Sequence, residues 1–189
     1  MIRLLNEPGM HPAEPLLIGS LLRTPLLTAP LQQIVYRDTV RYNYRTLIER
    51  IGRLARVLQQ MGVEEGDTVA VMDWDSHRYL ESYFAIPMMG AVLLTVNLRL
   101  SPEQIAYTLK QAGTKVVLLH HDFVELMHTL APQLPGIRAT LLLEPEAGDM
   151  APFGRQTAEY ESALAGADRS FAYREFDEQA VATMYFTTG

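Results

Sequence analysis

Apolar and polar residues alternate with a helical period over residues 44–61, the most regular stretch of the chain. At about 100° per residue, apolar side chains fall on one side of a helix and charged side chains on the other. The apolar side holds Leu47, Ile48, Ile51, Leu54, Ala55, Leu58 and Met61, and the charged side holds Arg45, Glu49, Arg50, Arg53 and Arg56. The pattern predicts an amphipathic helix that ends at Gly62, with its arginine side solvated.

Short, nearly unbroken apolar runs follow this helix and are separated by helical patterns. Such runs are typical of strands that are buried on both faces of a parallel sheet. Strands are predicted over residues 68–72, 91–96, 115–119, 139–143 and 180–186, and helices over 76–89, 101–112, 122–130 and 157–164. The alternation predicts an α/β fold with a largely parallel sheet, flanked by helices and joined by right-handed crossovers.

Capping and turn residues indicate where several elements begin. Residues 101–104, Ser-Pro-Glu-Gln, combine a capping box with proline at the first helical position. Ser76 is a residue type favoured as an N-cap. Residues 33–37 and 40–44 flank Asp38 and Thr39, which predicts either a short β-ribbon with a tight turn or one extended segment.

The beginning of the chain differs from the α/β pattern. Residues 1–15 are rich in proline and glycine and predict an arm, and residues 16–27 predict a short helix ending before Pro25 or Pro30. We therefore divide the chain into an arm with a short helix, residues 1–30, and one α/β unit, residues 31–189. Within that unit, residues 144–154 are expected to form a surface excursion.

Composition narrows the classes of partner and site. The net charge is −6 and the lysines are Lys110 and Lys115, which argues against a broad surface for nucleic acid or anionic membrane. The absence of cysteine excludes disulfides, thiol nucleophiles and cysteine-ligated zinc. The sequence shows neither the apolar core of a signal peptide nor a run long enough to span a bilayer, so we expect a cytoplasmic location.

Carboxylates and histidines follow two of the predicted strands. Asp73 and Asp75 come directly after residues 68–72, where α/β sheets often place ligand groups. A metal or phosphate-acceptor site and a turn that caps the next helix both explain them. His120, His121 and Asp122 follow another strand, and a histidine pair can bind metal or move protons.

The histidines are nevertheless expected to have structural roles. Adjacent side chains point in different directions and the sequence shows no third ligand beside His120 and His121. His77 and His128 lie on predicted helices, where we expect them at the surface. No metal site is therefore predicted.

Thr187, Thr188 and Gly189 directly follow the predicted strand over residues 180–186. Many phosphate-binding loops begin in this way, because hydroxyls and backbone N–H groups face the anion and glycine lets the chain approach closely. An ordinary strand end has the same residues. Since a strand rarely ends a domain by running into an unfinished turn, we expect this chain to be the front piece of a longer protein.

Several stretches resemble the N-terminal part of an acyl-CoA synthetase (fatty-acyl-CoA ligase) of the adenylate-forming (AMP-binding) superfamily. Residues 42–47 and 62–70 resemble the family opening YTYxEL…GVxxGDxVAV, and residues 79–87 and 90–93 resemble the segment that follows it. Residues 97–105 match the family stretch NxRLxPEQI, and residues 185–189 match the start of the family's phosphate loop. The resemblance covers nearly everything from residue 16 onward. It implies the N-terminal subdomain of the adenylate-forming fold, truncated within the phosphate loop.

The resemblance also implies a reaction and its cofactors. A fatty acid, ATP and CoA would give acyl-CoA, AMP and diphosphate through an acyl-adenylate, with Mg²⁺, and Thr187, Thr188 and Gly189 would hold the ATP phosphates. The family's catalytic and metal-binding residues have no counterpart here, so this acid–thiol ligase fragment is expected to be inactive alone. Alternatives are a ligase for an aryl, short-chain or sulfur-containing acid, or a non-catalytic scaffold that forms a homodimer through its apolar N-terminal arm.

Overall fold

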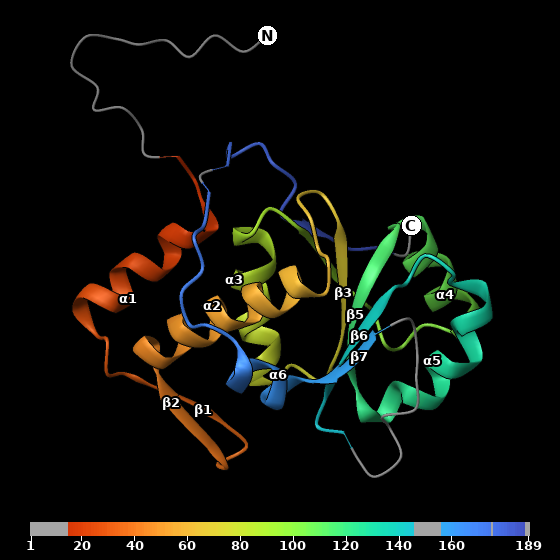
Figure 1. Ribbon diagram of the computed structural model, residues 1–189, viewed down its shortest axis with the longest axis horizontal. Coiled ribbons are helices and arrows are strands. Elements are labelled where there is room, and N and C mark those ends of the chain that lie inside the picture. Colours follow the sequence, from red (N-terminus) through yellow and green to blue (C-terminus); the bar gives the residue numbers. More distant parts are fainter. Residues whose placement is uncertain (1–14, 146–155, 175, 188–189) are drawn as a thin grey trace, which may run out of the picture.

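The structure is a computed structural model that describes residues 15–145, 156–174 and 176–187. The arm over residues 1–15 and the excursion over 144–154 fall almost entirely outside these ranges. Figure 1 shows a central sheet with helices on both sides and a small separate ribbon.

The elements follow in the order helix, ribbon, helix and then alternating strands and helices. The helices, with η for the 3₁₀ type, are η1 (Ile18–Leu22), α1 (Arg23–Thr28), α2 (Tyr44–Gln60), α3 (His77–Met88), α4 (Pro102–Gln111), η2 (His121–Phe123), α5 (Val124–Leu130), η3 (Ala131–Gln133) and α6 (Tyr160–Gly166). The strands are β1 (Gln33–Tyr36), β2 (Val40–Asn43), β3 (Thr68–Met72), β4 (Val92–Thr95), β5 (Thr114–His120), β6 (Ala139–Leu143), β7 (Gln156–Glu159) and β8 (Thr183–Met184). None of these helices could span a bilayer.

The larger sheet has six strands in the order β7-β6-β5-β3-β4-β8, and every neighbouring pair is parallel. β1 and β2 pair antiparallel in the ribbon. The predicted α/β class, the parallel sheet and the ribbon are therefore confirmed. Parallel pairing also brings the carboxyl ends of all six strands to one edge of the sheet, where open α/β sheets bind ligands.

Two apolar clusters lie on opposite faces of this sheet. Side chains alternate along β3, so Val69 and Val71 enter one cluster and Ala70 and Met72 the other. The first cluster contains the buried sides of α2, α3 and α6, and the second those of α4 and α5. All five residues of β3 are buried, as its unbroken apolar run predicts.

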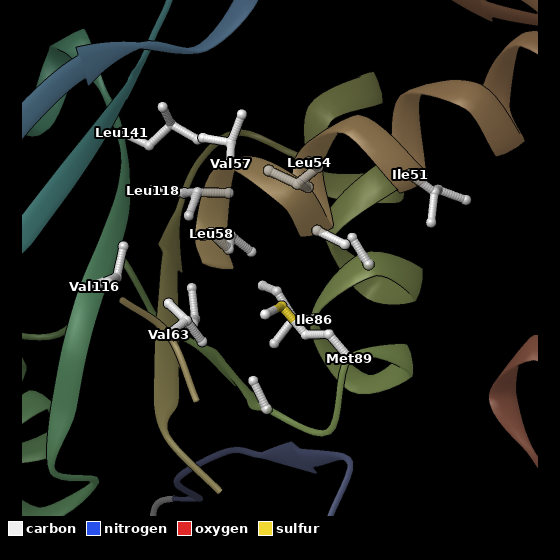
Figure 2. Packing of buried hydrophobic residues seen from close by; sticks show 14 of the residues in the cluster. Ile51, Leu54, Val57, Leu58, Val63, Ile86, Met89, Val116, Leu118 and Leu141 are labelled. Atoms are coloured by element: carbon white, nitrogen blue, oxygen red, sulfur yellow. The ribbon is translucent and has the colours of Figure 1, made fainter. Parts of the chain in front are cut away.

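Helix α2 packs its predicted apolar side on the sheet. Figure 2 shows Leu54, Val57 and Leu58 of α2 beside Leu118 and Leu141 of the strands. Each large side chain buried in this way contributes roughly 1.5–3 kcal/mol to folding, an upper estimate. The helix ends as expected before Gly62, whose φ of 81° suits glycine.

The charged side of α2 is only partly solvated, which corrects the prediction: Arg45 and Glu49 are exposed, whereas the other arginines are partly buried. Arg53 Nη1 donates hydrogen bonds to the carbonyl oxygens of Leu164 and Ala167 at 2.8 and 2.7 Å, and Arg56 Nη2 donates to Ser170 O at 3.3 Å. The chain after α6 thus covers this side of the helix. The carbonyl groups of Ala167 and Ser170 need donors because they lie after α6 and belong to no helix or strand ladder.

The last predicted strand is also different in the structure. β8 is two residues long and pairs through Thr183 and Met184 with β4 on one side only. Val181 and Tyr185 are 63% and 69% exposed, so residues 180–186 are not buried on both faces. An edge strand has a neighbour on one side, and among the described residues nothing packs on its other side.

One further helix boundary moves, and another agrees with one of its two predicted positions. Residues 156–159 form β7 against β6, and α6 begins only at Tyr160, because the Glu159 carboxylate caps it by accepting from the N–H groups of Glu161 and Ser162. Near the N-terminus, α1 continues through Pro25 and ends before Pro30. Proline is tolerated in a first helical turn, where its missing N–H needs no partner.

Candidate functional site

Thr187 lies at the carboxyl edge of the sheet, three residues beyond the pairing of Met184 with Leu94 of β4. The side chains of Met184 and Phe186 pack on the second apolar cluster, while Thr187 is exposed. An exposed hydroxyl after a parallel strand is suited to a phosphate oxygen. Thr188 and Gly189 lie outside the described residues, so the phosphate-binding role of the three residues stays a prediction.

The carboxylates after β3 form a turn. Asp73 is buried and accepts hydrogen bonds from the Trp74 N–H at 2.8 Å and from Ser76 Oγ. Ser76 in turn accepts from the Arg78 N–H at 3.1 Å and caps α3, as expected. Asp75 is exposed and has a φ of 50°. The structure therefore favours the capping turn over a metal or phosphate-acceptor site here.

A buried carboxylate of α3 joins this helix to α2, α6 and β2. Glu81 of α3 is 0% exposed and accepts hydrogen bonds from Arg50 Nε at 2.6 Å, Tyr160 Oη at 2.6 Å and Tyr42 Oη at 2.9 Å. Burial and the neighbouring Glu81 charge both raise the pKa of the Tyr160 and Tyr42 phenols, so each remains a protonated donor. The carboxylate thus has its charge paired and its oxygens satisfied.

A second carboxylate continues this network towards the edge. Glu161 accepts both Nη groups of Arg50 at 2.9 and 3.0 Å and Arg78 Nε at 2.8 Å. Arg78 Nη1 also donates to Glu144 Oε1 at 2.6 Å. The network links α2, α3 and α6 to the end of β6, and such two-pronged contacts hold the elements in one arrangement.

His77 belongs to this network, which corrects its predicted surface position. The residue is buried, and its Nε2 lies 3.5 Å from Glu161 Oε1. Its ring is 5.3 Å from that of Tyr36, centroid to centroid, on the β-ribbon. His128 is exposed, as expected.

The pKa of Glu161 makes the free energy of unfolding depend on pH in the acidic range. Burial alone raises this pKa, but hydrogen bonds from His77 and Arg50 hold it well below its ordinary value of about 4.3. A depressed folded-state pKa stabilises the protein above about pH 4.3, and the contribution is lost as pH falls towards the folded value. We expect the free energy of unfolding to decrease less between pH 6 and pH 3 in Glu161→Gln than in the parent chain, measured by urea denaturation at each pH.

Glu125→Gln, which removes an exposed carboxylate from α5, is the matched control for that titration. It should keep the parent dependence on pH. A Glu161→Gln variant with the same acid dependence as the parent would show that this carboxylate is not held in its charged form by folding.

His120, His121 and Asp122 gather at the carboxyl end of β5. The imidazole rings lie 4.5 Å apart, centroid to centroid, so the two adjacent side chains do not diverge as predicted. One potential ligand atom from each of the three residues lies within 4.8 Å of the others, and Asp122 is the third group that the sequence did not reveal.

Sequence reasoning missed the Glu81 network, although it left a trace. Glu81 is the lone carboxylate within the otherwise uncharged residues 79–89, on the side of α3 that becomes buried. A buried carboxylate requires a cation, and Arg50 stood on the charged side of α2. The two residues are far apart in the chain, so only the packing of α2 on α3 reveals the pair.

The family model described as AMP-binding enzyme matches residues 25–189. The chain belongs to the AMP-binding enzyme family. The match includes the sheet, the charged network and Thr187. The fold predicted from the resemblance, the N-terminal part of an adenylate-forming acyl-CoA synthetase, is thereby supported.

Curated relatives in this family are CoA ligases. A long-chain-fatty-acid–CoA ligase of Thermus thermophilus is 36% identical over 149 residues, which cover 79% of this chain and 26% of that protein. A 3-methylmercaptopropionyl-CoA ligase of Ruegeria lacuscaerulensis is 26% identical, and the match covers 96% of this chain and 34% of that protein. A medium-chain-fatty-acid–CoA ligase of Ectopseudomonas oleovorans is 28% identical, and the match covers 92% of this chain and 33% of that protein. The chain therefore spans about a quarter to a third of the length of these relatives.

Solved structures of CoA ligases share the fold. A putative long-chain-fatty-acid CoA ligase from Rhodopseudomonas palustris superposes with a TM-score of 0.73 at 26% identity, covering 87% of this chain and 39% of that one. The anthranilate CoA ligase AuaEII, in complex with anthranoyl-AMP, superposes with a TM-score of 0.80 at 17% identity, covering 90% of this chain and 32% of that one. The second likeness shows the fold alone.

Proposed function

We propose that this chain is part of an ATP-dependent acyl-CoA synthetase that activates a fatty acid. The observation that carries the proposal is the family match over residues 25–189, together with 36% identity to a long-chain-fatty-acid–CoA ligase. In this reaction the acid attacks the α-phosphate of ATP to form an acyl-adenylate and diphosphate, and the CoA thiol then displaces AMP. The cytoplasm remains the proposed location.

Thr187, Thr188 and Gly189 are proposed to hold the ATP phosphates. The position of Thr187 supports this role, because its hydroxyl is exposed at the carboxyl edge of a parallel sheet. Hydroxyl and backbone N–H donors suit phosphate oxygens, whereas Mg²⁺ prefers carboxylates and phosphates as ligands. We therefore assign phosphate contacts, and no Mg²⁺ ligand, to these three residues.

Replacing Thr187 by valine should weaken adenylation in an active longer protein that carries these residues. Loss of a hydrogen bond to a charged oxygen lowers kcat/KM for ATP by about tenfold or more. ATP–pyrophosphate exchange with a saturating acid measures the effect. Thr183→Val, which removes another exposed threonine from the same segment, is the control and should leave the ATP kinetics unchanged. Equal kinetics for the two variants would remove Thr187 from the phosphate site.

The 189 residues alone are proposed to be inactive. Support comes from the length of the chain, about a quarter to a third of that of the curated relatives. A pyrophosphate-release assay with ATP, Mg²⁺ and fatty acids should read background. Turnover above background would contradict this proposal without contradicting the family assignment.

Ligases for other acids and a non-catalytic scaffold are the alternative functions. The relative that acts on 3-methylmercaptopropionate favours a sulfur-containing acid as second candidate. An acid panel in the exchange assay, including aryl and short-chain acids, distinguishes the substrates. The exposed side chains of Leu21 in η1 and Leu27 in α1 support a homodimer through the N-terminal segment. Light scattering after size exclusion tests this proposal, and a monomer mass would contradict the dimer.

A further inference from the structure

The carboxylate of Asp122 lies between two imidazole rings at the end of β5. Its Oδ2 is 3.5 Å from His120 Nδ1, and its Oδ1 is 3.2 Å from His121 Nε2. Two ligands on one tetrahedral Zn²⁺ stand about 3.4 Å apart, given metal–ligand bonds of about 2.0–2.1 Å. Both separations are close to that value, and one potential ligand atom from each of the three residues lies within 4.8 Å of the other two.

The remaining nitrogen of His120 has the environment of a metal-bound histidine. The residue is 4% exposed, and its Nε2 has no hydrogen-bond partner in the described part of the chain. Nδ1 accepts a long hydrogen bond from the Asp122 backbone N–H at 3.3 Å, which assigns the ring proton to Nε2. Because Nδ1 has one lone pair, a metal ion on this nitrogen would replace that hydrogen bond. This Nε2 lies 3.8 Å from Glu144 Oε2, which is beyond hydrogen-bond distance but places a carboxylate beside the ring. A histidine that binds metal through one nitrogen usually donates its other N–H to such a carboxylate.

Glu144 is held where this role requires it. Its Oε1 accepts from Arg78 Nη1 at 2.6 Å, which leaves Oε2 directed towards His120. The ligand cluster is also accessible, because the side chains of His121 and Asp122 are 28% and 45% exposed. A buried inner histidine with partly exposed outer ligands leaves an entry path for an ion from solvent.

We propose that His120, His121 and Asp122 bind one divalent transition-metal ion of the zinc class. Two imidazoles and a carboxylate form a donor set that Zn²⁺ and its neighbours prefer, whereas Ca²⁺ and Mg²⁺ favour oxygen ligands. His120 binds through Nδ1, Glu144 orients its ring, and water completes the coordination. The ion links the loop after β5 to Trp74 after β3 and to Glu144 after β6. In the sheet order, this site stands three strand positions from β8 and Thr187.

The only tryptophan of the chain reports on this site. Trp74 Nε1 donates to Asp122 Oδ2 at 2.7 Å, and its ring lies 5.0 Å from that of Phe123, centroid to centroid. Titration of the untagged 189-residue chain with ZnCl₂ should change Trp74 fluorescence and saturate at one equivalent. CoCl₂ should quench the same fluorescence and produce the visible absorption of Co²⁺ bound to nitrogen and oxygen.

Two ligand variants and one control complete the experiment. His121→Ala and Asp122→Asn should each weaken Zn²⁺ binding by about tenfold or more, with circular dichroism unchanged. The asparagine side chain in Asp122→Asn retains an oxygen that can accept the hydrogen bond from Trp74 Nε1, so Trp74 fluorescence still reports on the site. His128→Ala, on the exposed surface of α5, should bind like the parent. A parent chain that shows no saturable response to a tenfold excess of Zn²⁺ would overturn the proposal and leave a hydrogen-bonded cluster only. Affinity that is unchanged in His121→Ala, or lost equally in His128→Ala, would also overturn it.

Discussion

Replacing Glu81 by alanine should lower the free energy of unfolding by about 3–5 kcal/mol, the cost of breaking a buried ion pair. The substitution leaves the phenols of Tyr42 and Tyr160 and part of the Arg50 guanidinium without their acceptor. Tyr160 is fully buried, so water cannot replace the lost hydrogen bond. Since a domain of this kind is stable by about 5–15 kcal/mol, this single change removes a large part of the total.

Urea denaturation followed by far-UV circular dichroism measures this loss. Glu49→Ala is the matched control, because Glu49 is an exposed carboxylate on α2 and its removal should alter stability by about 0.5 kcal/mol or less. The stability loss of Glu81→Gln should lie between those of Glu81→Ala and Glu49→Ala, since a glutamine amide keeps the side-chain shape and one acceptor oxygen but not the negative charge. A Glu81→Ala variant within about 1 kcal/mol of the parent would show that the network does not hold α2, α3 and α6 together.

Replacing Gly52 by alanine should destabilise the protein, against the usual preference of helices. Alanine is about 1 kcal/mol more favourable than glycine in a helix interior. A Cβ at Gly52 would, however, stand 2.4 Å from the carbonyl oxygen of Arg169, which is a backbone atom. The hydrogen bonds from Arg53 to Ala167 and from Arg56 to Ser170 keep that segment in place. We expect a loss of about 1–3 kcal/mol, typical of overpacking.

Thermal denaturation decides the sign of the Gly52→Ala effect. Gly166→Ala is the control, because a Cβ at Gly166, the last residue of α6, meets no atom within 4 Å. The control should leave the midpoint unchanged or raise it, while Gly52→Ala lowers it. A higher midpoint for Gly52→Ala would mean that residues 167–170 do not pack on α2 in solution.

Most of the fold follows from patterns that are local in the sequence. The apolar side of α2, the five buried residues of β3 and the bounds of β6 agree with the predicted elements. The capping box of Ser101 and Gln104 is present in full. Each of these features depends on residues within a few turns or one strand of each other, so spacing alone reveals them. The parallel sheet then follows from their alternation.

Only part of the candidate site could be predicted from local sequence patterns. The position of Thr187 after a strand of the sheet was predicted, because the motif and the strand are contiguous. The pairing of Asp122 with both histidines was not, because periodicity does not describe the turn that follows β5. Glu144, which directly follows β6, approaches His120 only through the parallel register of β5 and β6.

The sequence by itself determined most of the helices and strands, because secondary structure depends largely on the period of apolar positions and on caps. It did not predict β7 or the short length of β8. Tertiary structure decided what the polar residues do. Arg50 pairs with Glu81, Arg53 holds the chain after α6, and His77 is buried beside Glu161. The same charged pattern is compatible with solvent or with a partner, and only the packing of distant elements excludes water and selects the partner.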